Sequence, residues 1–272
     1  MIGTLAGAVG VLLLAATPHP VASPWRTIQP GVEYARFDLP NALNIGEGRL
    51  HVVRIDPRVA RLEAALASEH GGGPRAAADW CREQRLAVAI NMGMYQSDGV
   101  TNVGYLRSGS RANNGTWNAY RSVLFLRPRQ GGHPTALWVD RDSDTGAPRG
   151  AGDYGLVVQN LRLIRNPGRS VWQPTGKRWS EAAVGMDAGG RLLFLFARCP
   201  LSMAEFNRAV LAAPLHLTRA MHVEGGPEAS LSIHAGGIDL DLCGSYETGF
   251  HEDDSNHRQW PIPNVLGVKR VP

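Results

Sequence analysis

Residues 221–237 read MHVEGGPEASLSIHAGG, a stretch in which a glycine-rich turn carries two acidic residues. An apolar run precedes Glu224, and alternating apolar residues occupy positions 229–234, so the pattern predicts a strand on each side of the turn. The Gly-Gly-Pro sequence at 225–227 is typical of a tightly bent backbone. We therefore expect Glu224 and Glu228 to lie at the rim of a sheet.

The two acids of this stretch suggest chemistry. Most Gly-Gly-Pro sequences are simply turns, and a plain turn is the alternative here as well. A turn, however, requires neither Glu224 nor Glu228, whereas general acid and base catalysis requires carboxylates held on a rigid backbone. The stretch is therefore a candidate catalytic segment.

The composition limits the class of protein. The chain has 272 residues, 43% of them hydrophobic, and no low-complexity linker divides it, which favours one large domain with a buried core. The net charge is +4, and the basic residues are scattered rather than gathered in a run or an aromatic-interleaved patch. We therefore expect no nucleic-acid partner.

The first residues resemble an export signal. Residues 2–16 are almost wholly apolar, no charged side chain precedes Arg26, and Pro18 and Pro20 end the run. The run is short for a membrane-spanning helix, which needs ~20 apolar residues. It predicts a signal peptide or N-terminal anchor over residues 1–23 and a periplasmic or secreted protein, which would touch a membrane only through an uncleaved N-terminal segment.

Apolar runs predict most of the strands. Strands are expected at 32–38, 49–56, 86–90, 121–127, 135–141 and 191–199. The run GLVVQNLRLIR at 155–165 is interpreted as a hairpin that turns at Gln159 and Asn160. The chain is therefore expected to be rich in β-structure.

Two helices are expected among these strands. Good helix formers occupy 75–85, and the spacing of Ser202 to Glu205 matches a capping box that begins a second helix. The order of elements predicts an α+β fold, with a mixed β-sheet core and flanking helices, in a single domain over residues 24–272.

Metal-binding patterns in the sequence are weak. DRDSDTG at 140–146 spaces carboxylates like a calcium loop, but its glycine falls one position late and Ala151 occupies the position of the bidentate glutamate. HEDDSN at 251–256 is interpreted as an acidic surface loop. The three cysteines are too widely spaced for zinc-type pairs, and they form either one disulfide or buried free thiols. We expect no metal and no cofactor.

Two further stretches offer polar groups beside glycines. AINMGMYQ ends a predicted strand with Asn91 and Tyr95 on either side of Gly93, where the backbone can approach a ligand closely. GSYETGF carries Glu247 between two glycines. Each stretch is a weak signal alone, and their combination with the acidic turn is more specific.

A third stretch carries two arginines among small residues. GYLRSGSRANNG at 104–115 contains Arg107 and Arg111. Guanidinium groups bind phosphates through paired N–H donors, so this stretch is a candidate cradle for an anion.

Taken together, AINMGMY, SEAAVGMDAGGRLLFLF, SMAEFNRAVLA and RAMHVEGGPEASL make residues 32–268 similar to the phosphodiester glycosidase family. That family includes the uncovering enzyme that removes N-acetylglucosamine from a sugar phosphodiester, and many exported bacterial proteins linked to surface polysaccharide. Its commoner pattern has a strand ending in Asn-Gly-Gly, then Arg-Thr-Ala-Ile-Gly, then Leu-Asp-Gly-Gly-Gly-Ser. The matching positions here are Asn91 and Gly93, then Gly185, then Glu224, Gly225, Gly226 and Ser230.

The chain departs from this pattern at several positions. Glu181 stands where the pattern has arginine, and Glu224 replaces its aspartate, which moves the carboxylate by one methylene. Pro227 and Glu228 are inserted before the serine. The sequence resembles a bacterial branch of the family, so the resemblance does not transfer a substrate.

The resemblance implies an exported hydrolase that cleaves a sugar-1-phosphodiester bond in a surface polysaccharide or glycoconjugate, with a carbohydrate or sugar phosphate as its partner. Glu224 is the candidate base or nucleophile, and Glu228 or Glu247 is the second carboxylate. The candidate substrate contacts are Arg107 and Arg111 for the phosphate, Asn91, Tyr95 and Ser230 for sugar hydroxyls, and the backbone at Gly93, Gly225 and Gly226.

A non-catalytic polysaccharide-binding or assembly protein of the cell envelope is the alternative, because Glu181 replaces the family's arginine. Such a protein would use aromatic platforms, for which Trp117, Trp172 and Trp179 are the candidates, and would not need two acids on one turn. Asp187 opens the sequence DAGG and is expected to have a structural role.

Overall fold

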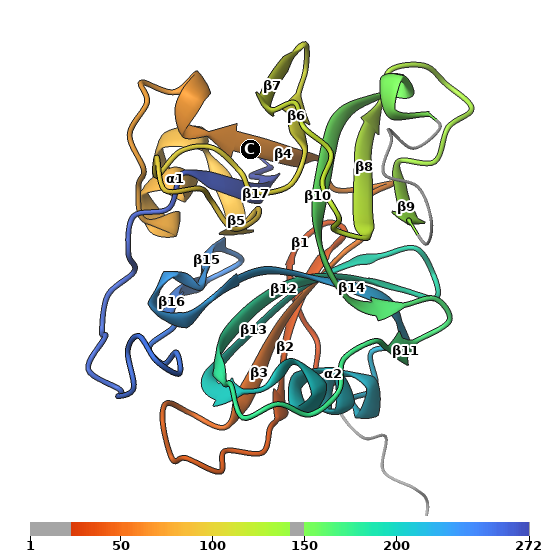
Figure 1. The fold of residues 1–272 in the computed structure, drawn as a ribbon. Helices are drawn as coiled ribbons and strands as arrows, with labels where there is room; N and C mark the ends of the chain where they lie inside the picture. The colour runs from red at the N-terminus through yellow and green to blue at the C-terminus, as the bar shows by residue number, and fades with distance from the viewer. Residues whose placement is uncertain (1–22, 142–149, 272) are drawn as a thin grey trace, which may run out of the picture.

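The computed structural model describes residues 23–141 and 150–271 (Figure 1). The predicted signal peptide or anchor at 1–23 and the calcium-like stretch at 140–146 fall almost entirely outside these residues. No helix in the described part of the chain has the length and apolar character needed to cross a membrane.

Strands make up most of the structure. The larger sheet contains β1 (Arg26–Gln29), β2 (Val32–Asp38), β3 (Arg49–Ile55), β6 (Leu106–Ser108), β7 (Arg111–Asn114), β8 (Ser122–Pro128), β9 (Ala136–Asp140), β10 (Tyr154–Arg165), β11 (Arg169–Ser170), β12 (Trp179–Asp187), β13 (Leu192–Leu201) and β14 (Leu217–Gly225). The smaller sheet contains β4 (Leu62–Leu66), β5 (Leu86–Asn91), β15 (Ser230–Ala235), β16 (Ile238–Cys243) and β17 (Asn264–Lys269). The helices are α1 (Ala77–Gln84) and α2 (Met203–Ala212), with short 3-10 turns η1 (Ala67–Glu69), η2 (Ala151–Asp153) and η3 (Gly226–Glu228).

Both sheets are antiparallel. The main order of the 12-stranded sheet is β1-β2-β3-β13-β12-β14-β10-β6-β7, and the 5-stranded sheet has the order β16-β15-β5-β17-β4. All strand pairings among the described residues are antiparallel, so the expected mixed sheet is wrong. Strands account for 47% of the residues and helices for 11%, which makes the fold more β-dominated than the expected α+β class. Neighbouring strands such as β2 and β3 or β12 and β13 follow each other through connections too short for a parallel crossover.

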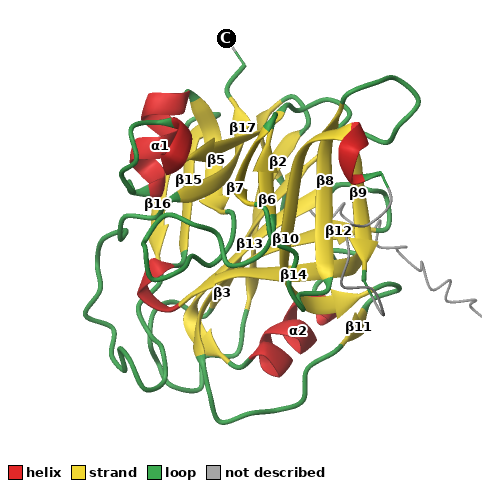
Figure 2. Cartoon of the chain, turned by 45° about the horizontal axis from the view of Figure 1, so that its top comes forward, coloured by secondary structure: helices red, strands yellow, loops and turns green. Residues whose placement is uncertain are grey.

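The core lies between the two sheets. One face of the larger sheet contributes Val184 and Phe194, which share a cluster with Ile90 and Leu231 of the smaller sheet. Helix α2 covers the opposite face of the larger sheet, where Leu195 belongs to a second cluster. Figure 2 shows α1 and α2 on the outside of the molecule. Because both faces of β13 are buried, its sequence is a continuous apolar run rather than an alternating one.

Most of the expected elements are confirmed. The strands expected at 32–38, 49–56, 86–90, 121–127, 135–141 and 191–199 are β2, β3, β5, β8, β9 and β13, and the helix expected at 75–85 is α1. The capping box is also present, because Ser202 Oγ accepts from Glu205 N at 3.4 Å while Glu205 Oε2 accepts from Ser202 N at 2.9 Å. The cysteines are all free and buried: Cys81, Cys199 and Cys243.

The hairpin expected at 155–165 is wrong, because these residues form the continuous strand β10. Gln159 and Asn160 look like turn residues in the sequence, but both are buried and their amides have partners. Gln159 Nε2 donates to the Tyr120 carbonyl at 2.7 Å, and Asn160 Nδ2 donates to the Met92 carbonyl at 2.8 Å. These side chains fasten loops to the strand.

The acidic turn joins the two sheets. The strands predicted on each side of it are confirmed as β14 and β15, but β14 belongs to the larger sheet and β15 to the smaller one. Gly226 begins the turn with a φ of +64°, a conformation that favours glycine. Gly244 packs against it so closely that a Cβ there would lie 1.9 Å from the Gly226 carbonyl oxygen.

We predict that Gly244→Ala destabilises the protein by about 1–3 kcal/mol or more, because the added methyl group forces the turn away from Gly244. Gly176→Ala is the matched control, since nothing lies within 4 Å of its Cβ position. Urea denaturation of both variants measures the difference. Equal stabilities of the two variants would contradict the packing described for the turn.

Candidate active site

A pocket of about 390 Å³ opens beside the acidic turn. Its volume lies within the range of small-molecule sites. Segments distant in the sequence contribute to it: the loop after β5, strands β10, β12 and β14, the start of α2, the turn η3 and the loop after β16. The lining residues are Met94, Tyr95, Leu161, Trp179, Met203, His222, Glu224, Gly225, Glu228 and Glu247.

Three glutamates of the pocket surround the turn. Glu224 is near the end of β14, Glu228 is in η3, and Glu247 is in the loop that follows β16. Gly226 lies between two of them, because a Cβ there would be 2.6 Å from Glu247 Oε2 and 3.5 Å from Glu228 Oε2. The glycine therefore provides both the backbone bend and the space that these carboxylates occupy. The predicted catalytic carboxylates are brought together in one pocket.

A buried ion pair lies next to Glu224. His222 Nδ1 is 2.6 Å from Glu181 Oε1, and both side chains are almost completely inaccessible to solvent. Trp179 donates from Nε1 to Glu181 Oε2 at 2.6 Å, so both carboxylate oxygens have partners. The Nε2 atom of His222 has no hydrogen-bond partner among the described residues, and the ring lines the pocket.

The surroundings of His222 favour its charged form. Burial alone lowers the pKa of His222, but the Glu181 carboxylate raises it through its charge and its hydrogen bond, and Glu224 and Glu247 raise it further. The net direction is above the ordinary value of 6.5. A raised pKa favours the imidazolium form of His222, which would present a positive charge to the pocket.

The surroundings of Glu224 favour its neutral form. Its side chain is 9% exposed, and burial is the largest cause of a pKa raised to about 8. The His222 charge and the Gly225 N–H lower this pKa, whereas Glu228 and Glu247 raise it. Burial and then Glu247 also raise the pKa of Glu228. Glu224 therefore holds its proton at neutral pH.

Tyr95 completes the polar lining. Burial, followed by the charges of Glu228 and Glu224, raises the pKa of Tyr95 to about 12. Its hydroxyl group is neutral in the working range of most proteins and can donate a hydrogen bond to a ligand. Of the sugar contacts predicted from the sequence, Tyr95 is the side chain that lines the pocket.

Asn91 and Ser230 support the turn from behind. Asn91 Nδ2 donates to the Glu228 carbonyl at 3.0 Å, and Asn91 Oδ1 accepts from Ser230 N at 2.7 Å. Neither residue lines the pocket, so their assignment as sugar contacts stays a prediction. Gly93 is also packed inside, because a Cβ there would lie 2.5 Å from Asn102 Oδ1.

The two predicted phosphate-binding arginines lie outside the pocket. Arg107 donates to the backbone carbonyls of Gly109, Ala151 and Tyr154, at 2.6–2.8 Å. Arg111 lines a separate cavity beside the turn between β6 and β7. The structure does not bring either arginine together with the glutamates, and their role toward phosphate stays a prediction.

Only one of the three tryptophans predicted as aromatic platforms lines the pocket. Trp117 stacks on Tyr105, and Trp172 donates to a backbone carbonyl, so Trp179 is the member of the three that lines the pocket. A Cβ at Gly225 would lie 2.8 Å from the Trp179 ring, which explains why this position has a glycine.

Asp187 has the structural role expected for it, because its carboxylate accepts hydrogen bonds from two backbone N–H groups of its own turn.

The sequence did not point to His222 as a pocket residue or to its pairing with Glu181. The signal for His222 was available, because alternate residues of a strand share one face and His222 precedes Glu224 by two positions. No sequence spacing connects Glu181 with His222, since their strands become neighbours only in the sheet. Among residues 23–141 and 150–271, no cluster of three or more His, Cys, Asp or Glu side chains is arranged to hold a metal ion.

We predict that Glu181→Gln lowers the pKa of His222, because burial then acts against the charged ring without its main opposing partner. NMR titration of the imidazole signals measures this change, and the missing signal of a His222→Gln variant identifies the resonance. Glu33→Gln removes a carboxylate that pairs with Arg54, away from the pocket, and is the control. An unchanged His222 titration in Glu181→Gln would refute the pairing.

Comparisons with known proteins find similar sequences and similar folds. The model of the phosphodiester glycosidase family matches residues 84–269, whereas the chain matches no curated protein. The catalytic domain of zebrafish N-acetylglucosamine-1-phosphodiester alpha-N-acetylglucosaminidase, auto-inhibited by its pro-peptide, is 13% identical over 95% of this chain and 87% of its own, with a TM-score of 0.60. A hypothetical protein from Synechocystis is 15% identical over 89% of this chain and 64% of its own, with a TM-score of 0.58. Since the family model covers more than half of the sequence, the chain belongs to the phosphodiester glycosidase family.

Proposed function

We propose that this protein is an exported hydrolase that cleaves a sugar-1-phosphodiester bond in a surface polysaccharide or glycoconjugate, with the pocket at Glu224 as its active site. The observation that carries this proposal is the gathering of three glutamates and one buried imidazolium in a single pocket. Family membership supports the bond type, and the uncharged apolar N-terminal sequence supports export.

The negative charge of the substrate explains why the pocket needs raised pKa values at Glu224 and His222. A phosphodiester carries a negative charge, and three ionised glutamates would repel it. Burial keeps Glu224 neutral, while His222 contributes a positive charge beside it. The pocket can therefore accept an anion despite its acidic residues. We assign His222 Nε2 as the donor to a phosphate oxygen, since this atom has no partner in the described structure.

Glu224 fits the role of general acid. When the bond between the sugar and the phosphate breaks, the departing phosphate ester gains a second negative charge, and its conjugate acid has a pKa of about 6. A carboxyl group that holds its proton at neutral pH can donate to the bridging oxygen as this charge develops. The sequence alone suggested a base or nucleophile at Glu224, and the raised pKa favours the acid instead.

Glu228 and Glu247 supply the second function. Glycoside cleavage passes through an oxocarbenium-like centre, which a nearby carboxylate stabilises or attacks, or to which it delivers water. Their carboxylates lie on the two sides of Gly226, close to Glu224. We assign the stabilisation of the sugar and the activation of water to this pair, and hydrogen bonding to sugar hydroxyls to Tyr95.

His222 also bears on the non-catalytic alternative. That alternative rested on the loss of the family's arginine at Glu181. In this chain Glu181 is buried behind His222, and the positive charge enters the pocket from β14 rather than from β12. An exchange of this kind would keep a cation in the pocket for an anionic ligand, which hydrolysis and binding both require. The three glutamates gathered beside His222 favour hydrolysis, because binding alone does not need them.

We predict that Glu224→Gln lowers the rate of hydrolysis of a chromogenic sugar-1-phosphodiester by ~10² or more while the fold is kept, because the amide cannot donate a proton to the leaving oxygen. Turnover and thermal melting are measured together. Glu69→Gln, which removes a carboxylate from η1 outside the pocket, is the control and retains the parent rate. Activity within threefold of the parent would exclude Glu224 as the acid.

The pH profile gives an independent prediction. The pKa of Glu224 is raised from 4.5 to about 8, so its protonated form persists up to that pH. A general acid with this pKa predicts that the rate falls as the pH rises through about 8, whereas a general base predicts that it rises. The measurement is kcat/KM between pH 5 and about 10. A basic limb that remains unchanged in Glu224→Gln would contradict the assignment.

A further inference from the structure

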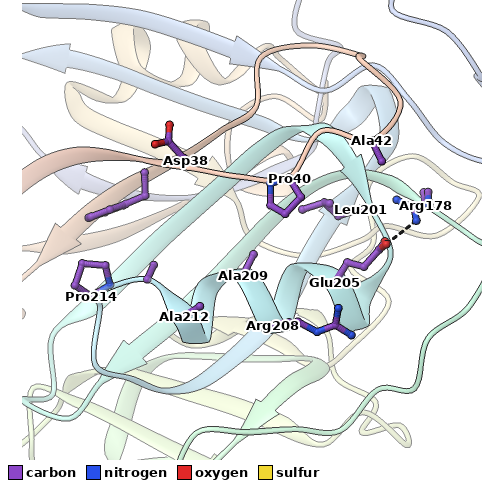
Figure 3. Close-up of a pocket in the computed structure, with 12 residues that line it drawn as sticks. Asp38, Pro40, Ala42, Arg178, Leu201, Glu205, Arg208, Ala209, Ala212 and Pro214 are labelled. Atoms are coloured by element: carbon purple, nitrogen blue, oxygen red, sulfur yellow. Dashed lines mark hydrogen bonds and ion pairs between the residues drawn. The ribbon is translucent and has the colours of Figure 1, made fainter.

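A second cavity, of about 510 Å³, lies beside helix α2 (Figure 3). Side chains of α2, the end of β2 with the loop that follows it, and the end of β13 enclose it. Its walls are mostly apolar, with contributions from Phe37, Pro40, Leu201, Ala209, Ala212 and Pro214. None of its lining residues belongs to the pocket around Glu224.

The spacing of residues in α2 explains the cavity. Phe206 and Val210 are buried against the larger sheet. Arg208, Ala209 and Ala212 recur at spacings of three and four and form another face of the helix, which lines the cavity. Alanines at these positions leave a space between the helix and Pro40 that larger side chains would fill.

The charged side chains around the cavity differ in whether they have a partner. Arg178 pairs with Glu205 at 2.5 Å, as the dashed line in Figure 3 marks, and Asp38 pairs with Arg49. Arg208 is exposed, and it has no hydrogen bond or ion pair with any described residue. The cavity thus combines an apolar interior with one unneutralised guanidinium group.

We propose that this cavity binds a single-chain alkyl carboxylate, a fatty-acid-like amphiphile. Cavities of this size with mostly apolar walls and few polar groups are typical of small-molecule sites. The alkyl chain would lie against Phe37, Leu201 and Ala209, and the carboxylate would pair with the two-pronged guanidinium of Arg208. The cavity is separate from the proposed active site, so this assignment does not rest on the proposed hydrolysis.

Isothermal titration calorimetry of the full chain with dodecanoate, below its micellar concentration, tests the proposal. We expect saturable binding by the parent, a loss of affinity of about tenfold or more in Arg208→Ala, and loss of binding in Ala212→Trp, whose indole fills the cavity. Arg258→Ala removes an exposed arginine from the loop before β17 and is the matched control that keeps the parent affinity. Glu224→Gln also keeps it, which distinguishes this cavity from the active site.

Amphiphiles of the same chain length test the head group. Dodecyltrimethylammonium is expected not to bind, because its cationic head group would lie beside the guanidinium of Arg208. Absent binding of dodecanoate, equal binding of the cationic amphiphile, or an unchanged affinity in Arg208→Ala would each overturn the proposal. Thermal melting checks the fold of every variant, and Ala212→Leu replaces Ala212→Trp if the tryptophan prevents folding.

Discussion

The passage of the chain from one sheet to the other at residues 225–228 is the constraint on which the site depends. Within this short turn the backbone leaves β14 of the larger sheet and enters β15 of the smaller one. Asn91 fixes the turn from the side of β5 through Glu228 and Ser230, and Gly244 packs against it at a distance that excludes a Cβ. A turn clamped in this way holds the carboxylates of Glu224 and Glu228 in a fixed arrangement.

Burial determines the chemistry of these carboxylates. In water Glu224 would be ionised at neutral pH, whereas in the pocket burial and two neighbouring glutamates keep it protonated. Burial has the opposite effect on His222, and the partnership with Glu181 reverses it. The same buried pocket therefore favours a neutral Glu224 and a charged His222, because Glu181 pairs with His222 whereas Glu228 and Glu247 repel a negative charge on Glu224.

Helix α2 covers the outer face of the larger sheet only in part. Helix α2 covers this face with Phe206 and Val210, while small side chains on another face of the helix leave a cavity. The capping box at Ser202 fixes where the helix begins, and Met203, its first residue, lines the pocket around Glu224. One helix therefore borders two cavities that share no lining residue.

The sequence by itself determined the local elements and the acidic turn. Apolar runs located β2, β3, β5, β8, β9 and β13, and the resemblance at Glu224 and its glycines indicated the family, because these features depend on neighbouring residues. Only the tertiary structure decided that the sheets are antiparallel, that Gln159 and Asn160 lie inside a strand, and that Arg107 binds backbone carbonyls rather than lining the pocket. It also decided the pairing of Glu181 with His222 and the protonation of Glu224. Burial and the contacts between distant strands set these properties, and neither is encoded in the spacing of residues along the chain.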